Sequence, residues 1–269
     1  MIRRAIASCL ALGLVLSAPT VLHGQQSMIA VSEALSVEVL PGWREADGRH
    51  VAGLQFRLAP GWKTYWRSAG STGISPQMDW RRSRNAASVT PEWPTPIVSG
   101  PPGSLSIGYV TDFVLPIVVQ AADPARPIQL RGRLDIGVCR DVCLPARFDV
   151  SGVLPVAGQN DPRILAALKD RPSQSSVRAT CTMRPTPDGA VLTGEMRLPS
   201  LGGDEAVVFE LPDPRLWVTD ANVRRNGDML SAQSELMLGG GGALAVDRGQ
   251  VRITVIGENG AVEVMGCSG

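Results

Sequence analysis

The chain has 269 residues, of which 44% are hydrophobic and 19% charged, with 29 glycines and 21 prolines. This composition is typical of one or two globular domains and excludes collagen, a coiled coil and a disordered tail. The 26 lysines and arginines nearly balance the 25 aspartates and glutamates, so the net charge is +1. Because a strong positive field is needed to hold a phosphate backbone or an anionic membrane, no nucleic-acid partner is expected.

The first residues have the pattern of an export signal. Arg3 and Arg4 precede an apolar run at 5–16, and small and polar residues follow as far as Gly24. A positive start, a short apolar run and a polar end are typical of a secretory signal peptide. The run is shorter than the roughly 20 residues that a membrane-spanning helix needs. We therefore expect a signal peptide at 1–24, cleaved near Gly24, and an exported mature chain.

Short alternating apolar runs bounded by Gly, Pro, Asn and Asp recur along the chain, whereas helical periodicity is nearly absent. Alternation of this kind predicts half-buried strands. The first set of predicted strands is 35–40, 51–58, 113–119, 128–138 and 148–154. The second set is 190–198, 206–211, 217–221, 229–236, 251–256 and 261–265. Many short strands with regular turn signals indicate an all-β sandwich architecture.

One short helix is predicted between the two sets of strands. Asp161 offers an N-cap and Pro162 occupies the first helical position. Ile164, Leu165 and Leu168 then form one apolar stripe. The predicted organisation is a signal peptide at 1–24, a first domain at 25–156, a linker helix at 157–174 and a second β-sandwich domain at 175–269.

Residues 62–102 contain few regular signals and are rich in Trp, Gly and Pro. The tryptophans of this segment are Trp62, Trp66, Trp80 and Trp93. They could line a carbohydrate or cofactor surface, but such residues more often pin a long loop against the edge of a sandwich. We expect the structural role and an irregular loop.

Removal of the signal peptide leaves four cysteines and one histidine, His50. An even number of cysteines in an exported chain indicates disulfides. A bond between Cys181 and Cys267 closes a loop of about 87 residues, worth roughly 4.6 kcal/mol, and is expected to be structural. A bond between Cys139 and Cys143 closes about five residues, worth roughly 2 kcal/mol, so it contributes little to stability and is available for exchange.

The sequence around Cys139 and Cys143 predicts a strand that turns and runs back. Cysteines that face each other across a hairpin have Cα atoms about 4.5–5.5 Å apart, which suits a disulfide. Arg140 and Arg147 favour a thiolate, whereas Asp141 opposes it. From the spacing alone, an inert disulfide at a hairpin tip is an equal alternative to a redox-active one.

Other kinds of site have weaker support. Zinc needs four ligands and the mature chain has one histidine, so Cu(I) held by the thiolates of Cys139 and Cys143 is the remaining metal alternative. No cofactor is expected. A Ser-His-Asp or Cys-His hydrolase would have to use His50, which is expected to be a solvated histidine in a polar turn, and no Gly-x-Ser-x-Gly motif is present.

Several short motifs, in this order and spacing, resemble the periplasmic N-terminal domain of the thiol:disulfide interchange protein DsbD. They are Trp62-Lys63-Thr64-Tyr65-Trp66, residues 70–76, Trp93-Pro94, Gly108-Tyr109, Leu115-Pro116 and Cys139-x-x-x-Cys143-Leu144-Pro145. The resemblance covers residues 35–153 well and the second half loosely, and the cysteine motif is its specific part. Within the family the chain is similar to the ScsB branch, the suppressor of copper sensitivity, whose exported region also continues into a second β domain.

The resemblance implies a periplasmic protein of two immunoglobulin-like β-sandwich domains joined by a short helical linker. It implies that Cys139 and Cys143 cycle between dithiol and disulfide, with Cys143 forming the mixed disulfide and Cys139 resolving it. The implied partners are a thioredoxin-like domain with a transmembrane electron-carrier protein on the donor side, and oxidised periplasmic proteins as substrates. The ScsB branch also connects such a protein with copper tolerance.

The sequence departs from the family pattern in three respects. Three residues separate the cysteines, where the enterobacterial DsbD pattern has five, so a shorter hairpin is expected. The counterpart of the family's cap loop, residues 97–105, contains no aromatic residue, so shielding would fall to Pro101, Pro102 and Leu105. The transmembrane and thioredoxin-like domains do not follow in this sequence, so the electron donor is expected to be a separate protein.

Overall fold

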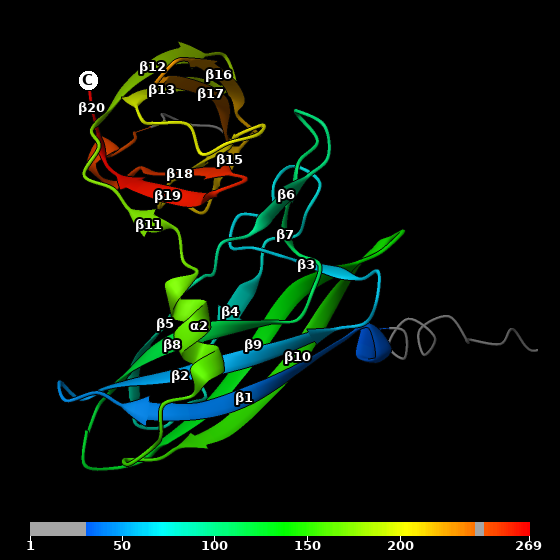
Figure 1. Ribbon diagram of the computed structural model, residues 1–269, viewed down its shortest axis with the longest axis vertical. Coiled ribbons are helices and arrows are strands. Elements are labelled where there is room, and N and C mark those ends of the chain that lie inside the picture. The colour runs from blue at the N-terminus through cyan, green and yellow to red at the C-terminus, as the bar shows by residue number, and fades with distance from the viewer. Residues whose placement is uncertain (1–30, 240–244) are drawn as a thin grey trace, which may run out of the picture.

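The computed structural model describes residues 31–239 and 245–269, so the predicted signal peptide at 1–24 lies outside the described residues. The described chain is mostly strand, and the strands form four sheets. Two sheets use strands from the first part of the chain and two use strands from the last part. Figure 1 shows the resulting two sandwiches one above the other, with the helix α2 on the connection between them. The predicted all-β class of two immunoglobulin-like sandwiches is confirmed.

The first sandwich packs a sheet of order β1-β2-β8-β5 against a sheet of order β10-β9-β3-β7-β6, with β4 also paired to β9. The bounds are β1 Leu35–Arg44, β2 Arg49–Leu58, β3 Lys63–Tyr65, β4 Gln77–Asp79, β5 Ala86–Pro91, β6 Ile97–Ser99, β7 Ser106–Tyr109, β8 Phe113–Ala121, β9 Ile128–Cys139 and β10 Cys143–Leu154. Leu54, Leu115 and Leu134 are completely buried between the two sheets. Burial of alternate strand residues holds the two sheets together.

The second sandwich consists of a sheet of order β11-β19-β18-β14 and a sheet of order β15-β17-β13-β12-β20, with β16 also paired to β17. The bounds are β11 Ser173–Gln174, β12 Ala179–Thr186, β13 Gly189–Arg197, β14 Ala206–Glu210, β15 Leu216–Val218, β16 Asn222–Asn226, β17 Met229–Leu238, β18 Arg252–Gly257, β19 Gly260–Met265 and β20 Cys267–Ser268, with a short 3₁₀ helix η1 at Arg248–Gln250. A disulfide joins Cys181 of β12 to Cys267 of β20, with a Cα–Cα distance of 5.5 Å. It fastens the last strand beside β12.

The predicted helix is present as α2 Pro162–Lys169, and the Asp161 side chain accepts a backbone N–H of its first turn, as expected. Ile164 is completely buried and Leu168 is partly buried. Leu165, predicted on the same stripe, is 37% exposed, because only one side of this short helix meets the protein. The helix packs on the outer face of the first sandwich, in a cluster with Leu40, Trp43, Val51 and Val114.

The segment at 62–102 is more regular than expected, because it contains β3, β4, β5 and β6. Three of these strands have only three residues, which is too short for alternation to be visible in the sequence, and their pairing with β7, β8 and β9 places them. Trp66 and Trp93 are buried, while Trp62 and Trp80 pack against the same core. The structural role expected for the four tryptophans is therefore confirmed.

Two further expectations differ from the structure. The strand expected at 217–221 ends at Val218 as β15, and a separate strand, β16, begins at Asn222; both pair with β17. His50, expected in a solvated turn, is completely buried in β2. Its Nε2 lies 2.6 Å from the carbonyl oxygen of Pro41 and its Nδ1 accepts a hydrogen bond from Arg44. The turn ends at Gly48, so His50 already belongs to the strand, and burial lowers the pKa of its imidazole.

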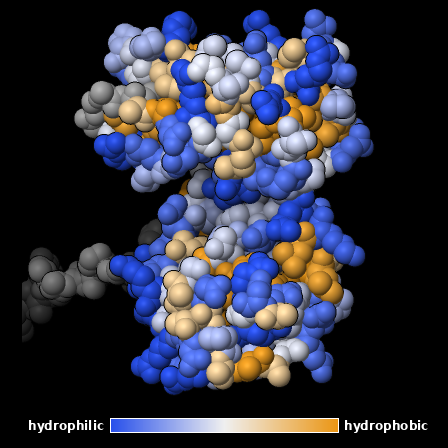
Figure 2. All heavy atoms as spheres, turned by 90° about the vertical axis from the view of Figure 1, so that its left-hand side faces the viewer, coloured by the Kyte–Doolittle hydropathy of each residue, from blue (hydrophilic) through white to orange (hydrophobic). Residues whose placement is uncertain are grey.

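Among the described residues, no helix has the length and apolar character required to cross a membrane. Figure 2 shows the two sandwiches as two lobes that meet at a narrower waist, with hydrophilic side chains over much of the visible face. Hydrogen bonds cross this waist, among them those that Arg67 of the first sandwich donates to Glu210 of the second.

Candidate functional site

The longest hairpin of the first sandwich ends in a disulfide between Cys139 and Cys143. Strands β9 and β10 pair in an unbroken antiparallel register that ends with Cys139 opposite Cys143. The two Cα atoms are 4.1 Å apart, and three residues form the connecting loop. The predicted facing cysteines and short hairpin are therefore present.

The two bonded cysteines differ sharply in burial. Cys139 is 1% exposed, whereas Cys143 is an exposed residue. Tyr65, Ala69 and Ile74 pack around Cys139 in a small cluster of their own. A thiol or thiolate from another molecule can therefore approach Cys143 but not Cys139.

The disulfide lies on the outer face of its sheet. Val138 and Leu134 point into the sandwich core, and successive strand residues point to opposite faces. Cys139, Gly137 and Asp135 therefore lie in a row on the other face. The sulfur atoms are positioned by a rigid core strand, while the bond itself stands outside the core.

Tyr65 of β3 is the side chain that reaches both sulfur atoms. Its hydroxyl oxygen lies 2.9 Å from Sγ of Cys139 and 3.0 Å from Sγ of Cys143. Since a disulfide sulfur has no hydrogen, the hydroxyl is the donor. Burial raises the pKa of Tyr65, which keeps this donor protonated at neutral pH.

A glycine allows the Tyr65 ring to take this position. A Cβ atom at Gly137 would lie 2.9 Å from the Tyr65 ring and 2.8 Å from Cβ of Ile74, both closer than a normal contact. In addition, the Thr64 hydroxyl donates a hydrogen bond of 2.8 Å to the carbonyl oxygen of Gly137. The sequence therefore specifies glycine where an aromatic ring must lie flat across the strand.

The charged side chains near the hairpin form pairs. Arg140 pairs with Asp141 in the loop, at 3.1 Å, and its guanidinium also lies over the Trp62 ring, 4.9 Å from the ring centre. Arg147 pairs with Asp135 at 2.6 Å across the two strands. Both arginines expected to favour a thiolate thus have a carboxylate partner, and all four groups are substantially exposed. Exposed pairs of this kind are screened by water, so Tyr65 is the nearer influence on the sulfur atoms.

The two prolines predicted to shield the disulfide lie elsewhere. Pro101 and Pro102 are exposed at the tip of the β6–β7 hairpin, and β3 separates that hairpin from β9 in the sheet. Leu105 is partly buried at the start of β7. The cover over Cys139 comes from residues 69–74, which we name the cover segment, together with Tyr65. Tyr65 and most of the cover segment belong to the motifs at 62–66 and 70–76 that resemble DsbD. Their position over Cys139 was not expected, because the pairing of β3 with β9 is not visible in the sequence.

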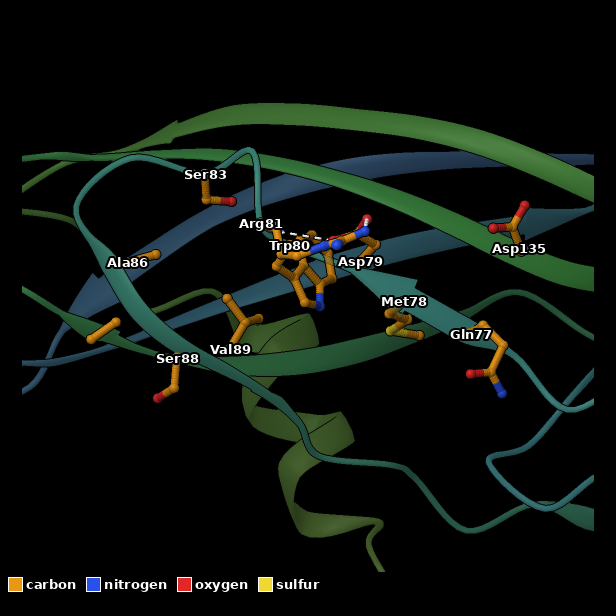
Figure 3. Close-up of a pocket in the computed structure, with 11 residues that line it drawn as sticks. Gln77, Met78, Asp79, Trp80, Arg81, Ser83, Ala86, Ser88, Val89 and Asp135 are labelled. Carbon is orange, nitrogen blue, oxygen red and sulfur yellow. Dashed lines mark hydrogen bonds and ion pairs between the residues drawn. The ribbon is translucent and has the colours of Figure 1, made fainter. Parts of the chain in front are cut away.

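A hollow of about 560 Å³ lies away from the disulfide, between β4 and β5. Figure 3 shows its lining, in which Arg81 is hydrogen-bonded to Asp79 beside Trp80. Its lining contains no cysteine. The described residues also contain no group of three or more His, Cys, Asp or Glu side chains that could hold a metal ion. The hairpin disulfide therefore lies outside this hollow.

The fold and this site define a class of protein: a tandem immunoglobulin-like β-sandwich with a short-loop disulfide at the end of one hairpin. Residues 25–155 match the family described as thiol:disulfide interchange protein DsbD, N-terminal. The match covers just under half of the chain, and these residues therefore belong to the DsbD N-terminal family.

A solved structure gives the same fold. The crystal structure of the N-terminal periplasmic domain of ScsB from Proteus mirabilis superimposes with a TM-score of 0.62 at 20% sequence identity. The match covers 87% of this chain and 92% of that chain, so it includes both sandwiches. A search of curated protein sequences gave no significant match.

Proposed function

We propose that this chain is a periplasmic thiol-disulfide exchange protein. It would pass reducing equivalents from a thioredoxin-like donor, linked to a transmembrane electron carrier, to oxidised periplasmic proteins. The observation that carries the proposal is the unequal burial of the two bonded cysteines, because it gives them different tasks. Membership of the DsbD N-terminal family supports the same class of reaction.

In the reducing half of the cycle, a thiolate of the donor attacks the sulfur of Cys143, the exposed residue of the pair. The Cys139–Cys143 bond breaks, Cys139 leaves as a thiolate and takes up a proton, and a donor–Cys143 disulfide forms. The donor's second thiolate then attacks its own partner sulfur and releases Cys143. The donor is oxidised to a disulfide, and two electrons have passed to the cysteine pair.

In the second half, the Cys143 thiolate attacks a disulfide of the oxidised client. One client sulfur leaves as a thiolate and a mixed disulfide forms through Cys143. Cys139 then attacks Cys143, which restores the bond in the hairpin and releases the client as a dithiol. Cys139 is suited to resolution because it lies directly opposite Cys143 and is covered from other molecules.

Tyr65 contributes to the reducing half of this cycle. When Cys139 leaves as a thiolate, the hydroxyl at 2.9 Å donates a hydrogen bond to the developing charge. Hydrogen bonds to charged groups are stronger than those between neutral groups. The hydroxyl therefore favours the departure of Cys139 over that of a sulfur with no donor.

Trapping tests the assignment of roles. In a Cys139→Ser variant, a mixed disulfide through Cys143 cannot be resolved internally, so covalent complexes with a thioredoxin-like protein should accumulate and be seen on non-reducing gels and by mass spectrometry. The matched Cys143→Ser variant should give no such complex, because Cys139 is buried. Absence of any complex through Cys143 would contradict the proposal.

The reduction potential of the pair separates exchange from an inert bridge. A value below about −300 mV is typical of a structural disulfide and would refute the redox role. Tight stoichiometric binding of Cu(I) to the reduced protein, without exchange, would instead favour a non-catalytic module that holds copper at Cys139 and Cys143. We expect a higher potential and exchange with thioredoxin-type reductants.

The organisation around this site is also part of the proposal. We propose a signal peptide at 1–24, a redox domain at 25–156, a linker at 157–174 and a second domain at 175–269. The Cys181–Cys267 disulfide would act there as a structural bond, since it lies within the second sandwich. The predicted signal and the likeness to the periplasmic domain of ScsB support the periplasmic location.

A further inference from the structure

One carboxylate of the second sandwich accepts several hydrogen bonds from the first. Asp220, between β15 and β16, accepts hydrogen bonds from the backbone N–H of Ser71 at 2.9 Å and from its hydroxyl at 2.6 Å. It also accepts the backbone N–H of Leu105 at 2.7 Å. All three donors belong to the first sandwich.

Leu105, one of the residues held by Asp220, is joined to the cover of the disulfide through Thr72. The backbone N–H and the hydroxyl of Thr72 both donate to the carbonyl oxygen of Leu105. Ser71 lies in the cover segment, two residues after Ala69 and three before Ile74, which pack on Cys139. Gly73 is so close to Ala69 and to the Tyr65 ring that a Cβ atom there would lie within 2.6 Å of both. The cover segment is thus a tight turn with little freedom to rearrange while Ser71 is held.

A second contact fixes the start of the same segment. Arg67, two residues before Ala69, donates to Glu210 at 2.9 Å and to Glu263 at 2.5 Å, both in the second sandwich. Its guanidinium also stacks on Trp66, 4.0 Å from the ring centre. Arg67 is only 15% exposed, so this charged network is shielded from water more than a surface pair. The second sandwich therefore holds the chain just before the cover segment, at Arg67, and within it, at Ser71.

We propose that Asp220 and Arg67 are positioning residues, through which the second sandwich keeps the cover segment closed over the sulfur of Cys139. This inference rests on the proposed function, since it gives the second sandwich the task of reserving Cys139 for resolution. Access to Cys139 requires the cover segment to open locally, and opening must break the hydrogen bonds to Asp220. Leu105, which donates to Asp220, directly precedes β7. Figure 1 shows the β6–β7 hairpin rising from the first sandwich toward the second.

Alkylation of the reduced full chain tests this inference. Iodoacetamide is added after reduction with a phosphine, and the labelling rates of Cys139 and Cys143 are followed separately by mass spectrometry. In an Asp220→Ala variant, we expect labelling of Cys139 to rise about tenfold or more, because three hydrogen bonds to a carboxylate no longer oppose opening. Labelling of Cys143, which is already exposed, should change less than about twofold. The matched control is Asp228→Ala, which removes an exposed carboxylate from the turn before β17.

If the ratio of Cys139 to Cys143 labelling is unchanged in a folded Asp220→Ala protein, the inference is overturned. A parallel rise in the labelling of both cysteines would indicate general loosening of the fold and would overturn it too. If Asp220→Ala does not fold, judged by near-ultraviolet circular dichroism, Ser71→Ala carries the test. That variant removes one of the three hydrogen bonds and should give a smaller rise at Cys139, while an unchanged rate would refute the inference. Exchange with a thioredoxin-type reductant is measured on the wild-type protein. Failure there refutes the proposed function, whereas the labelling ratio still reports on the cover.

Discussion

The Tyr65 hydroxyl offers the most direct test of how the site works. A Tyr65→Phe substitution removes the donor that lies 2.9 Å from Sγ of Cys139 and keeps the ring that packs against Gly137. We expect the protein to fold and the disulfide to form. The disulfide should, however, be reduced more slowly, because the departing Cys139 sulfur loses its hydrogen-bond donor.

The size of this effect follows from the charge on the departing sulfur. A hydrogen bond to a fully charged group contributes about 1.5–3 kcal/mol. With about half of the charge developed in the transition state, its loss raises the barrier by about 0.8–1.5 kcal/mol. The rate of reduction should then fall about 4- to 13-fold.

The rate is measured with dithiothreitol and with a thioredoxin-type reductant, by quenching with acid and counting free thiols. Tyr109→Phe is the matched control, because that buried hydroxyl donates instead to the carbonyl oxygen of Pro94, at 2.9 Å. It removes one hydrogen bond from the same sandwich without touching a cysteine. A Tyr65→Phe protein that is reduced within twofold of the Tyr109→Phe rate would refute the role given to the hydroxyl.

Three further outcomes are expected. Gly137→Ala should lower the free energy of unfolding by about 1–3 kcal/mol in urea titrations, because the new methyl group would overlap Ile74; an unchanged midpoint would contradict this packing. Replacing both Cys181 and Cys267 with alanine should cost about 2–5 kcal/mol of stability and leave exchange at the hairpin intact, so a loss of exchange in a folded variant would show that the bond is not merely structural. Burial lowers the pKa of His50, so the unfolded chain binds a proton there that the native chain does not, and stability should fall as the pH drops below about 6.5. Urea titrations between pH 7.5 and 5.5 should show a shallower decline for His50→Gln, and an equal decline would contradict this account.

The helix and most strands of five residues or more were predicted from the sequence, whereas the eight-residue β12 and the three-residue β3, β4 and β6 were not. β9 and β10 have twelve residues each and clear turn residues between them, so the facing of Cys139 and Cys143 could be foreseen. The cap of α2 at Asp161 was equally visible, because capping is a local interaction. By contrast, β3 has three residues and exists because it pairs with β7 and β9, which lie far away in the chain.

The candidate site shows the same division. The bonded cysteines follow from spacing, but Tyr65 reaches them only through the pairing of β3 with β9. The contact of Asp220 with Ser71 joins residues 149 positions apart, and neither residue stands in a pattern that indicates it. Burial of His50 was missed because the polar turn before it hid the beginning of the strand.

The β9–β10 ladder continues without a break up to the two bonded cysteines, and this bears on how successive partner proteins would use the site. The ladder holds the backbone on both sides of the bond, so under the proposed function the two strands would stay paired when the bond is reduced. This chain would then not release one partner protein by changing its shape for the next. The direction of electron flow would then be set by the redox potentials of the partner proteins themselves.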